Sequence, residues 1–314
     1  MSTTTQTAPA TRAAGRAQRL IMRIAIGVAV LLLAAYLLIS TLAANALTVP
    51  RRQPENRTPA ALGLAYDDVR FPSRADGIEL AGWYIPDQGS RKAVVLVHGW
   101  NSNRSAEFQG RFVDFAAALH DRGLAVMMID MRGHGASGDG HFSFGIRERY
   151  DVEGAVDWLE RQGFRPGSIG VLGVSMGAAT GIGAAADDPD IGALVEDCSF
   201  AEIYPLIERE WSNNTPLPKF FLPSTVLMGR LLLGYAIWDA RPIDEIGKIA
   251  PRPVLIVHGG GDTFVPVENG RRLKAAAPTA EYWEVPGAAH ASSYAADPQA
   301  YVDRVASFFQ SKLK

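Results

Sequence analysis

The chain has 314 residues, of which 47% are hydrophobic and 20% are charged, and its formal net charge at pH 7 is −2. This balance fits a globular body with a sizeable core plus an extra apolar segment, and it offers no basic surplus for a nucleic-acid partner. The lone cysteine, Cys198, excludes a disulfide within the chain and any cysteine-based metal cluster.

The N-terminal region divides into a basic tail and an apolar segment. Residues 1–23 hold four arginines and no acid, and without apolar periodicity they are expected to be disordered. Residues 24–47 carry no charge and, as a helix, would extend about 36 Å, which exceeds a bilayer core of about 30 Å. Because the arginines precede this segment, we predict a single-pass transmembrane signal anchor with a cytoplasmic N-terminus and an extracytoplasmic body.

A cleaved signal peptide is the alternative interpretation of the same segment. Ala44-Asn45-Ala46 resembles a small-residue cleavage site, and cleavage there would remove residues 1–46 and release a secreted protein. The apolar run is longer than a usual signal-peptide core, so we favour the uncleaved anchor. Residues 48–67, which contain three prolines, are expected to form a linker to a folded domain over 68–314.

From residue 68 onward, the pattern predicts an antiparallel hairpin and then strands and helices in alternation. This alternation is typical of an α/β fold whose mostly parallel central sheet, here of about eight strands, carries helices on both faces. The hairpin strands are expected at 69–71 and 77–86, and the later strands at 93–97, 125–129, 169–172, 192–195, 253–257 and 281–285. Amphipathic helices are expected from about 105 to 122, around 152–159 and from about 298.

Polar and glycine-rich clusters follow the expected strands. In open parallel sheets, ligands bind beyond the carboxyl ends of the strands, so these clusters are candidates for one shared site. In chain order they are His98-Gly99-Trp100, Asp130 to Gly135, Ser175, Asp197, His258 to Asp262, and His290.

The segment Gly173-Val174-Ser175-Met176-Gly177 joins an apolar run to a stretch of small residues. This pattern is typical of a nucleophile elbow, a strained strand-to-helix turn that exposes one serine above the sheet. Glycine at 173 and 177 allows the strand and helix to cross closely. We therefore predict that Ser175 is a catalytic nucleophile.

With these motifs in this order, residues 68–314 resemble the α/β-hydrolase fold family. The resemblance rests on the His98-Gly99 loop, the segment Arg132 to Gly135, the elbow, the segment His258 to Pro266 and the late His290. It implies a catalytic order of serine, acid and histidine along the chain.

The resemblance also implies a role for each site residue. His290 would be the base that takes the proton of Ser175, and Asp262 the acid that orients its imidazole, with Asp197 as the alternative acid. The backbone N–H groups of Trp100 and Met176 would form the oxyanion hole.

Three further features complete the prediction for the folded domain. The insertion at about 199–249 is rich in Leu and Phe, and we expect either a cap over the site or a helix buried on the sheet. Arg104 is expected to be solvated or to cap a helix. Asp130 and Arg132 are expected to hold together the loop that follows the fourth strand.

The sequence thus predicts a membrane-anchored serine hydrolase that cleaves an ester, thioester or amide of a small-molecule acyl substrate through an acyl-enzyme. An esterase is the first choice, and a peptidase or acyltransferase of the same fold is the nearest alternative. A membrane-tethered binding module without catalysis is a third. No cofactor, metal or nucleic acid is expected, and the sequence leaves the oligomeric state open.

Overall fold

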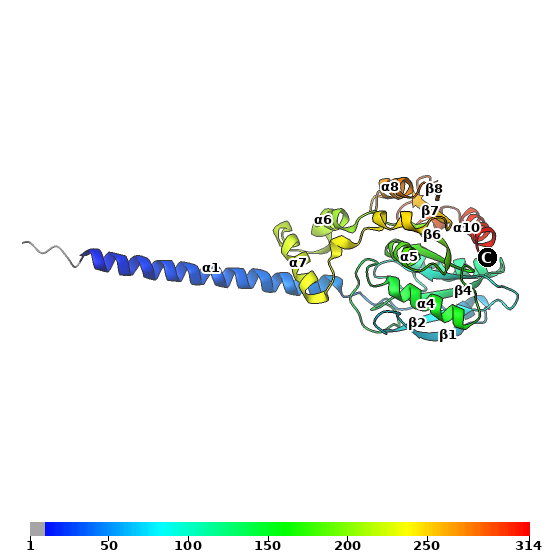
Figure 1. Cartoon of the computed structure of the whole chain (residues 1–314), viewed down its shortest axis with the longest axis horizontal. Helices are drawn as coiled ribbons and strands as arrows, with labels where there is room; N and C mark the ends of the chain where they lie inside the picture. The colour runs from blue at the N-terminus through cyan, green and yellow to red at the C-terminus, as the bar shows by residue number, and fades with distance from the viewer. Residues whose placement is uncertain (1–9) are drawn as a thin grey trace, which may run out of the picture.

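The computed structural model describes residues 10–314, with side chains from residue 15 onward. An eight-stranded sheet with helices on both faces forms the body, and one long helix, α1 (Ala10–Thr48), projects from it (Figure 1). Residues 10–23 lie within α1, although they were expected in the disordered tail. Their Ala, Arg and Gln content favours helix, and the apolar helix that follows extends through them. Residues 1–9 of the expected tail lie outside the described residues.

The central sheet confirms the predicted α/β fold. Its strand order is β1-β2-β4-β3-β5-β6-β7-β8, with β2 antiparallel to both of its neighbours and the remaining pairs parallel. The strands are β1 (Asp67–Pro72), β2 (Glu79–Ile85), β3 (Ala93–Val97), β4 (Ala125–Asp130), β5 (Ile169–Val174), β6 (Ile191–Asp197), β7 (Val254–Gly259) and β8 (Glu281–Val285).

Successive residues of the central strands contribute to two separate cores. In β3, Val95 and Val97 face one core while Val94 and Leu96 face the other, so the strand is buried on both sides and reads as a continuous apolar run. The first core is covered by α4 (Arg149–Arg161), α5 (Met176–Asp187) and α8 (Glu268–Ala276), and the second by α3 (Phe112–His120) and α10 (Pro298–Lys312). Two short helices, α2 (Glu107–Gly110) and α9 (Ser293–Ala296), complete the body.

The insertion at 199–249 folds into helices beyond the carboxyl edge of the sheet, beside the C-terminal end of α1 (Figure 1). It contains α6 (Ile203–Asn214), α7 (Leu222–Leu233) and the 3-10 helices η2 (Lys219–Phe221), η3 (Ile237–Asp239), η4 (Pro242–Asp244) and η5 (Ile246–Ile249). Because Leu227, Leu231 and Leu232 are exposed, α7 is not a helix buried on the sheet. We call α6, η2 and α7 the cap.

The C-terminal turns of α1 pack against the cap. Ser40 is fully buried, and its Oγ lies 2.8 Å from Oγ of Ser224. The hydroxyl of Tyr36 donates to the carbonyl of Phe220 at 2.7 Å. Residues 15–48 form the one described helix long and apolar enough to cross a membrane, and its most apolar 18 residues have a mean hydropathy of 2.5. Helices of this kind occur both as membrane anchors and as signal sequences.

The residues expected to form a linker are bound to the body. Asn103 donates from Nδ2 to the carbonyls of Gln53 and Pro54, each at 3.0 Å, and the N–H of Arg51 donates to Oδ1 of Asn101 at 2.8 Å. The 3-10 helix η1 (Pro59–Leu62) then leads into β1. The position of α1 relative to the sheet is therefore fixed by contacts on both sides of Thr48.

Candidate active site

Ser175 occupies a strained turn between β5 and α5. Its φ of 56° and ψ of −116° lie in a region that residues other than glycine rarely adopt. A Cβ on Gly173 would come within 2.1 Å of the Gly177 carbonyl oxygen, and one on Gly177 within 2.4 Å of the His98 carbonyl oxygen. Only glycine therefore fits at these two positions, as the elbow pattern predicts.

His290, in the loop after β8, lies between Ser175 and Asp262. Its Nε2 is 2.8 Å from Ser175 Oγ, and its Nδ1 is 2.7 Å from Asp262 Oδ2. With a carboxylate at Nδ1, the assigned tautomer carries its proton there and leaves Nε2 free to accept the serine proton. The ring of Phe264 packs edge-on against the imidazole at 5.0 Å between centroids. The three side chains therefore form one continuous hydrogen-bonded chain.

The carboxylate of Asp262 is held in place by backbone donors. Its Oδ1 accepts hydrogen bonds from the N–H groups of Phe264 at 2.9 Å and Val265 at 2.8 Å, and its side chain is fully buried. These bonds explain the Asp-Thr-Phe-Val-Pro turn, because the loop after β7 closes on the carboxylate. The remaining oxygen, Oδ2, is directed at His290.

Asp197, the alternative acid, has other partners. Its two carboxylate oxygens accept hydrogen bonds from Ser293 Oγ at 2.9 Å and Tyr301 Oη at 2.8 Å. Burial raises the pKa of Asp197 to about 6. The turn before Ser199 is held by the neighbouring Glu196, whose Oε2 accepts from the Ser199 N–H at 3.0 Å. Asp197 thus ties β6 to α9 and α10.

The expected oxyanion donors belong to two segments that meet at Ser175. The structure assigns no partner among the described residues to the N–H groups of Trp100 and Met176. A Cβ on Gly99 would lie 3.3 Å from Ser175 Cβ, so the loop carrying Trp100 passes directly beside the serine. Met176 begins α5, where the helix leaves its first N–H groups free.

Glu107 is a residue of this site that the sequence analysis missed. Its Oε1 accepts a hydrogen bond from the Gly99 N–H at 2.6 Å, and burial raises the pKa of its carboxyl. Glu107 therefore fixes the peptide immediately before the Trp100 N–H. A lone glutamate eight residues beyond the loop carries no sequence pattern that would have identified it.

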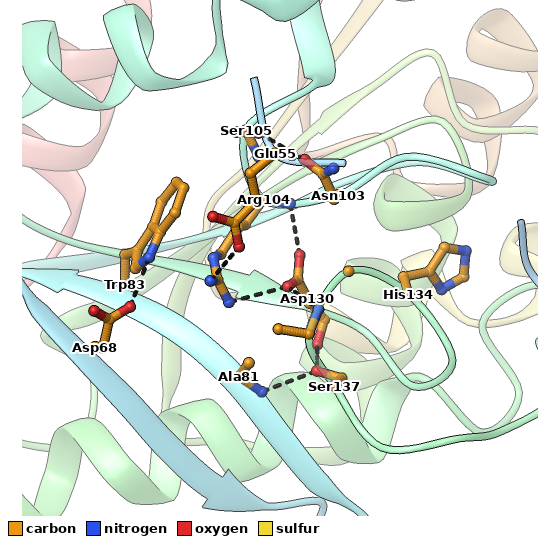
Figure 2. Close-up of polar contacts among 12 residues, drawn as sticks. Glu55, Asp68, Ala81, Trp83, Asn103, Arg104, Ser105, Asp130, His134 and Ser137 are labelled. Atoms are coloured by element: carbon orange, nitrogen blue, oxygen red, sulfur yellow. Dashed lines mark hydrogen bonds and ion pairs between the residues drawn. The ribbon is translucent and has the colours of Figure 1, made fainter. Parts of the chain in front are cut away.

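A buried ion pair supports the loops that follow β3 and β4. Arg104 pairs with Asp130 at 3.0 Å and also with Glu55, and its guanidinium lies 4.3 Å from the ring centroid of Trp83 (Figure 2). Arg104 was expected to be solvated or to cap a helix, and the structure corrects this. Two acidic partners far away in the sequence offset the free-energy cost of burying the Arg104 charge.

His98 joins the same two loops. Its Nε2 accepts from the Met131 N–H at 3.1 Å, which leaves Nδ1 to donate to the Gly99 carbonyl at 2.7 Å. Burial holds the pKa of His98 well below its usual value, so the ring stays neutral. This histidine and the Arg104 pair give the Gly99-Trp100 loop a fixed position.

An apolar cavity lies above Ser175, between the carboxyl edge of the sheet and helices α1, α6 and α7. Ser175 and Met176 belong to its wall on the sheet side, together with the rings of Trp100, Phe142 and Phe200. The cap and α1 supply the rest, chiefly Ala44, Leu47, Leu206, Ile207, Trp211, Val226, Gly229 and Leu233. The nucleophile candidate thus faces an environment that favours hydrocarbon.

Within the described residues, one group of side chains has the proximity of a metal site, namely Cys198, Asp262 and His290. Asp262 and His290 are already hydrogen-bonded to each other. Burial raises the pKa of the Cys198 thiol well above its usual value, whereas a metal ligand must be a thiolate. The Asp262 and His290 side chains are thus engaged with each other, and burial keeps the Cys198 thiol protonated.

Comparisons with known proteins agree with this architecture. Residues 94–304 match the sequence profile described as the alpha/beta hydrolase family. The chain is 29% identical to the uncharacterized protein YqkD of Bacillus subtilis, over 76% of this chain and 77% of YqkD. It is 31% identical to the uncharacterized protein Rv2307c of Mycobacterium tuberculosis, over 74% of this chain and 75% of Rv2307c.

Among solved structures, the chain is similar to the esterase Pf2001 of Pyrococcus furiosus. The TM-score is 0.68 and the sequence identity 27%, and the match covers 84% of this chain and 98% of the esterase.

Proposed function

The chain belongs to the alpha/beta hydrolase family, and on that premise we propose that it is a serine esterase with Ser175, His290 and Asp262 as its catalytic triad. The observation that carries the proposal is the hydrogen-bonded chain from Ser175 Oγ through His290 to Asp262, with distances of 2.8 and 2.7 Å. The structural similarity to an esterase supports the same reaction class.

The proposed reaction has two halves that use the same groups. Ser175 Oγ attacks the carbonyl carbon of the ester while its proton passes to His290 Nε2, and Asp262 stabilises the resulting imidazolium. The carbonyl oxygen becomes an oxyanion and accepts hydrogen bonds from the N–H groups of Trp100 and Met176, each contributing about 3 kcal/mol to transition-state stabilisation. The alcohol leaves with the proton from Nε2. Water then repeats the sequence against the acyl-enzyme and releases the acid.

The cavity favours an ester with an apolar acyl group over a peptide. Its lining is mainly aliphatic and aromatic, and the cap supplies one of its walls. A peptide backbone would leave its N–H and carbonyl groups without partners against such a surface. Hydrolysis of peptides, or acyl transfer to an acceptor other than water, is therefore the second choice.

We further propose that α1 is retained as a membrane anchor, with residues 49–67 bound to the body as its connection. The side chain of Ser40 is buried, and Tyr36 packs on Phe221 with 4.9 Å between ring centroids. Cleavage after Ala46 would remove these contacts and expose the cap side chains beneath them. The arginines before the apolar segment favour a cytoplasmic N-terminus and an extracytoplasmic body.

Replacement of the nucleophile tests the proposal. Ser175→Ala should lower turnover of an aryl ester by about a millionfold, because triad members act as a unit. The fold should survive, and the circular dichroism spectrum and melting temperature provide that control. Substantial residual turnover in a folded Ser175→Ala protein would show that another residue is the nucleophile.

A further inference from the structure

The cavity above Ser175 is built in part by the helix proposed as the membrane anchor. Ala44, Leu47 and Thr48 of α1 belong to its lining, as do Thr225, Val226 and Gly229 of α7. A membrane anchor usually makes few contacts with the domain that it attaches to the membrane. Here the C-terminal turns of α1 form one wall of the cavity above Ser175.

Contacts with α7 and with the body hold this wall in place. Ser40 bonds to Ser224 of α7, and Thr48 Oγ1 lies 2.8 Å from His141 Nδ1 in the body. A Cβ on Gly229 would lie 3.7 Å from Ala44 Cβ, so the two helices approach closely there. The position of α1 in the cavity wall is thus a feature of the packed fold.

The length of α1 places the cap at the membrane surface. As an α-helix, residues 20–39 extend about 30 Å, the thickness of a bilayer core, and Arg23, in the first turn of this span, can extend its guanidinium to the interface. Tyr36 and Ser40, which contact the cap, then lie where this span ends. The ring of Phe220 packs against Tyr36, and its side chain is 64% exposed, in keeping with the preference of aromatic side chains for the interface.

The exposed side of α7 is apolar in the same region. Leu231 is 70% exposed, and Leu227 and Leu232 are about half exposed. A soluble domain seldom displays several large apolar side chains on one helix without covering them. Beside a transmembrane helix, this surface fits the acyl region of the bilayer, with α7 lying in the interface.

We propose that the cavity binds the acyl chain of a membrane lipid ester that enters from the bilayer between α1 and the cap. The inference rests on the proposed esterase function and names its substrate class. A lipid in its leaflet has its ester at the surface and its chain directed into the bilayer. The site is arranged in the same direction. Ser175, which would attack the ester, lies on the side of the body, and α1 and α7, which would contact the acyl chain, lie on the side of the membrane.

Chain-length preference tests the cavity. The full chain is reconstituted in phosphatidylcholine vesicles, and kcat/KM is measured for 4-nitrophenyl esters from butyrate to laurate. Each buried methylene is expected to raise kcat/KM roughly fourfold, so decanoate, with six more methylenes, should exceed butyrate by about a thousandfold or more. A preference for butyrate with active enzyme would overturn the inference and leave the proposed esterase function intact. Failure to hydrolyse any ester would overturn both.

A bulky side chain introduced into the cavity from α1 tests whether α1 forms part of the cavity wall. Leu47→Trp should lower the ratio of decanoate to butyrate kcat/KM about tenfold or more, and Val226→Trp, from α7, should act in the same direction. Leu42→Trp is the matched control, because Leu42 is 61% exposed on the same helix and does not line the cavity. Labelling of Ser175 by a fluorophosphonate reports the amount of intact site in each variant. An unchanged ratio in both filled variants would contradict the inference.

The entry route separates a bilayer lipid from an ester in solution. Leu231→Glu places a charge on the exposed side of α7 and should slow hydrolysis of a monoacylglycerol in vesicles about tenfold while butyrate hydrolysis stays unchanged. Leu62→Glu is the matched control. Leu62 is also an exposed leucine that does not line the cavity, but it belongs to η1 and not to α7. Equal rates on vesicles for the wild type and Leu231→Glu would contradict entry beside α7.

Discussion

The carboxylate of Asp262 lies 2.7 Å from Nδ1 of His290, although α8 and β8 separate the two residues in the chain. Its other oxygen accepts two backbone hydrogen bonds, so the carboxylate cannot turn away from the imidazole without breaking them. The second acidic side chain at a strand end, Asp197, is occupied by Ser293 and Tyr301. Replacing each aspartate in turn therefore tests which of the two is the acid of the triad.

We expect Asp262→Asn to lower kcat about ten-thousandfold, because an amide there favours the wrong tautomer of His290 while preserving the shape of the site. Asp197→Asn should change kcat by less than about tenfold and should act mainly on the melting temperature, since its hydroxyl partners hold α9 and α10. Steady-state kinetics at pH 7 on both variants decide between them. The reverse ranking would make Asp197 the acid of the triad.

Glu107 is expected to act on catalysis through the Gly99 peptide. Glu107→Ala removes the acceptor of the Gly99 N–H and should lower kcat about tenfold with little change in KM, because the adjacent Trp100 N–H is the proposed oxyanion donor. Glu107→Gln keeps an acceptor oxygen and should stay close to the wild type. A purely structural role would instead lower the melting temperature of Glu107→Ala without altering kcat of the folded enzyme.

Glu196 predicts a pH dependence of stability. Complete burial raises its pKa to about 8, from an ordinary value near 4.5, and Oε1 has no hydrogen-bond partner. Between these two pH values the folded state retains a proton that the unfolded state has lost. The contribution of Glu196 is therefore fully present below about pH 4.5 and is lost as the pH rises towards 8, by at most about 1.4 kcal/mol per pH unit.

The glutamine of Glu196→Gln has no acidic proton to lose in this pH range. The melting temperature of this variant should therefore fall less between pH 5.5 and 8.5 than that of the wild type. Other buried carboxyls, such as that of Asp197, titrate in both proteins and cancel in the difference. Parallel pH curves for the two proteins would show that Glu196 has an ordinary pKa.

The anchor makes a prediction for the protein expressed in a bacterial host. The chain should remain in the membrane pellet after an alkaline carbonate wash, because the proposed anchor places the exposed apolar side chains of residues 20–39 in lipid. Edman sequencing of the protein in that pellet should give a residue near Met1. A mature N-terminus at Leu47 would instead identify the apolar segment as a cleaved signal.

The sequence alone predicts those parts of the fold that depend on local pattern. The run from Ala93 to Val97 is apolar at every position because both faces of β3 are buried, and the observed strand has these bounds. Gly173 is required by a contact inside the elbow, with the Gly177 carbonyl oxygen, so this part of the motif carries its own geometry. Gly177 is required by the His98 carbonyl oxygen after β3, a contact that the motif alone does not show.

Features that depend on distant partners were not predictable in this way. From the sequence alone, Arg104 is expected at the surface, because the sequence does not show that Asp130 and Glu55 lie beside it in the fold. The interface of α1 with α7 is equally hidden, because an apolar side chain that contacts lipid and one that contacts a cap look alike in a sequence. The same holds for Glu107, whose partner is a backbone N–H.

The central claim is that His290 activates Ser175, and its most direct test is covalent labelling by a fluorophosphonate, which reacts with an activated serine. In the full-length protein at pH 7, we predict one adduct per chain, located on Ser175 by peptide mass spectrometry. His290→Ala should slow the labelling about a thousandfold or more without unfolding the protein, since Nε2 would no longer take the serine proton. An adduct on another residue, or equal labelling rates with and without the His290 imidazole, would contradict the account.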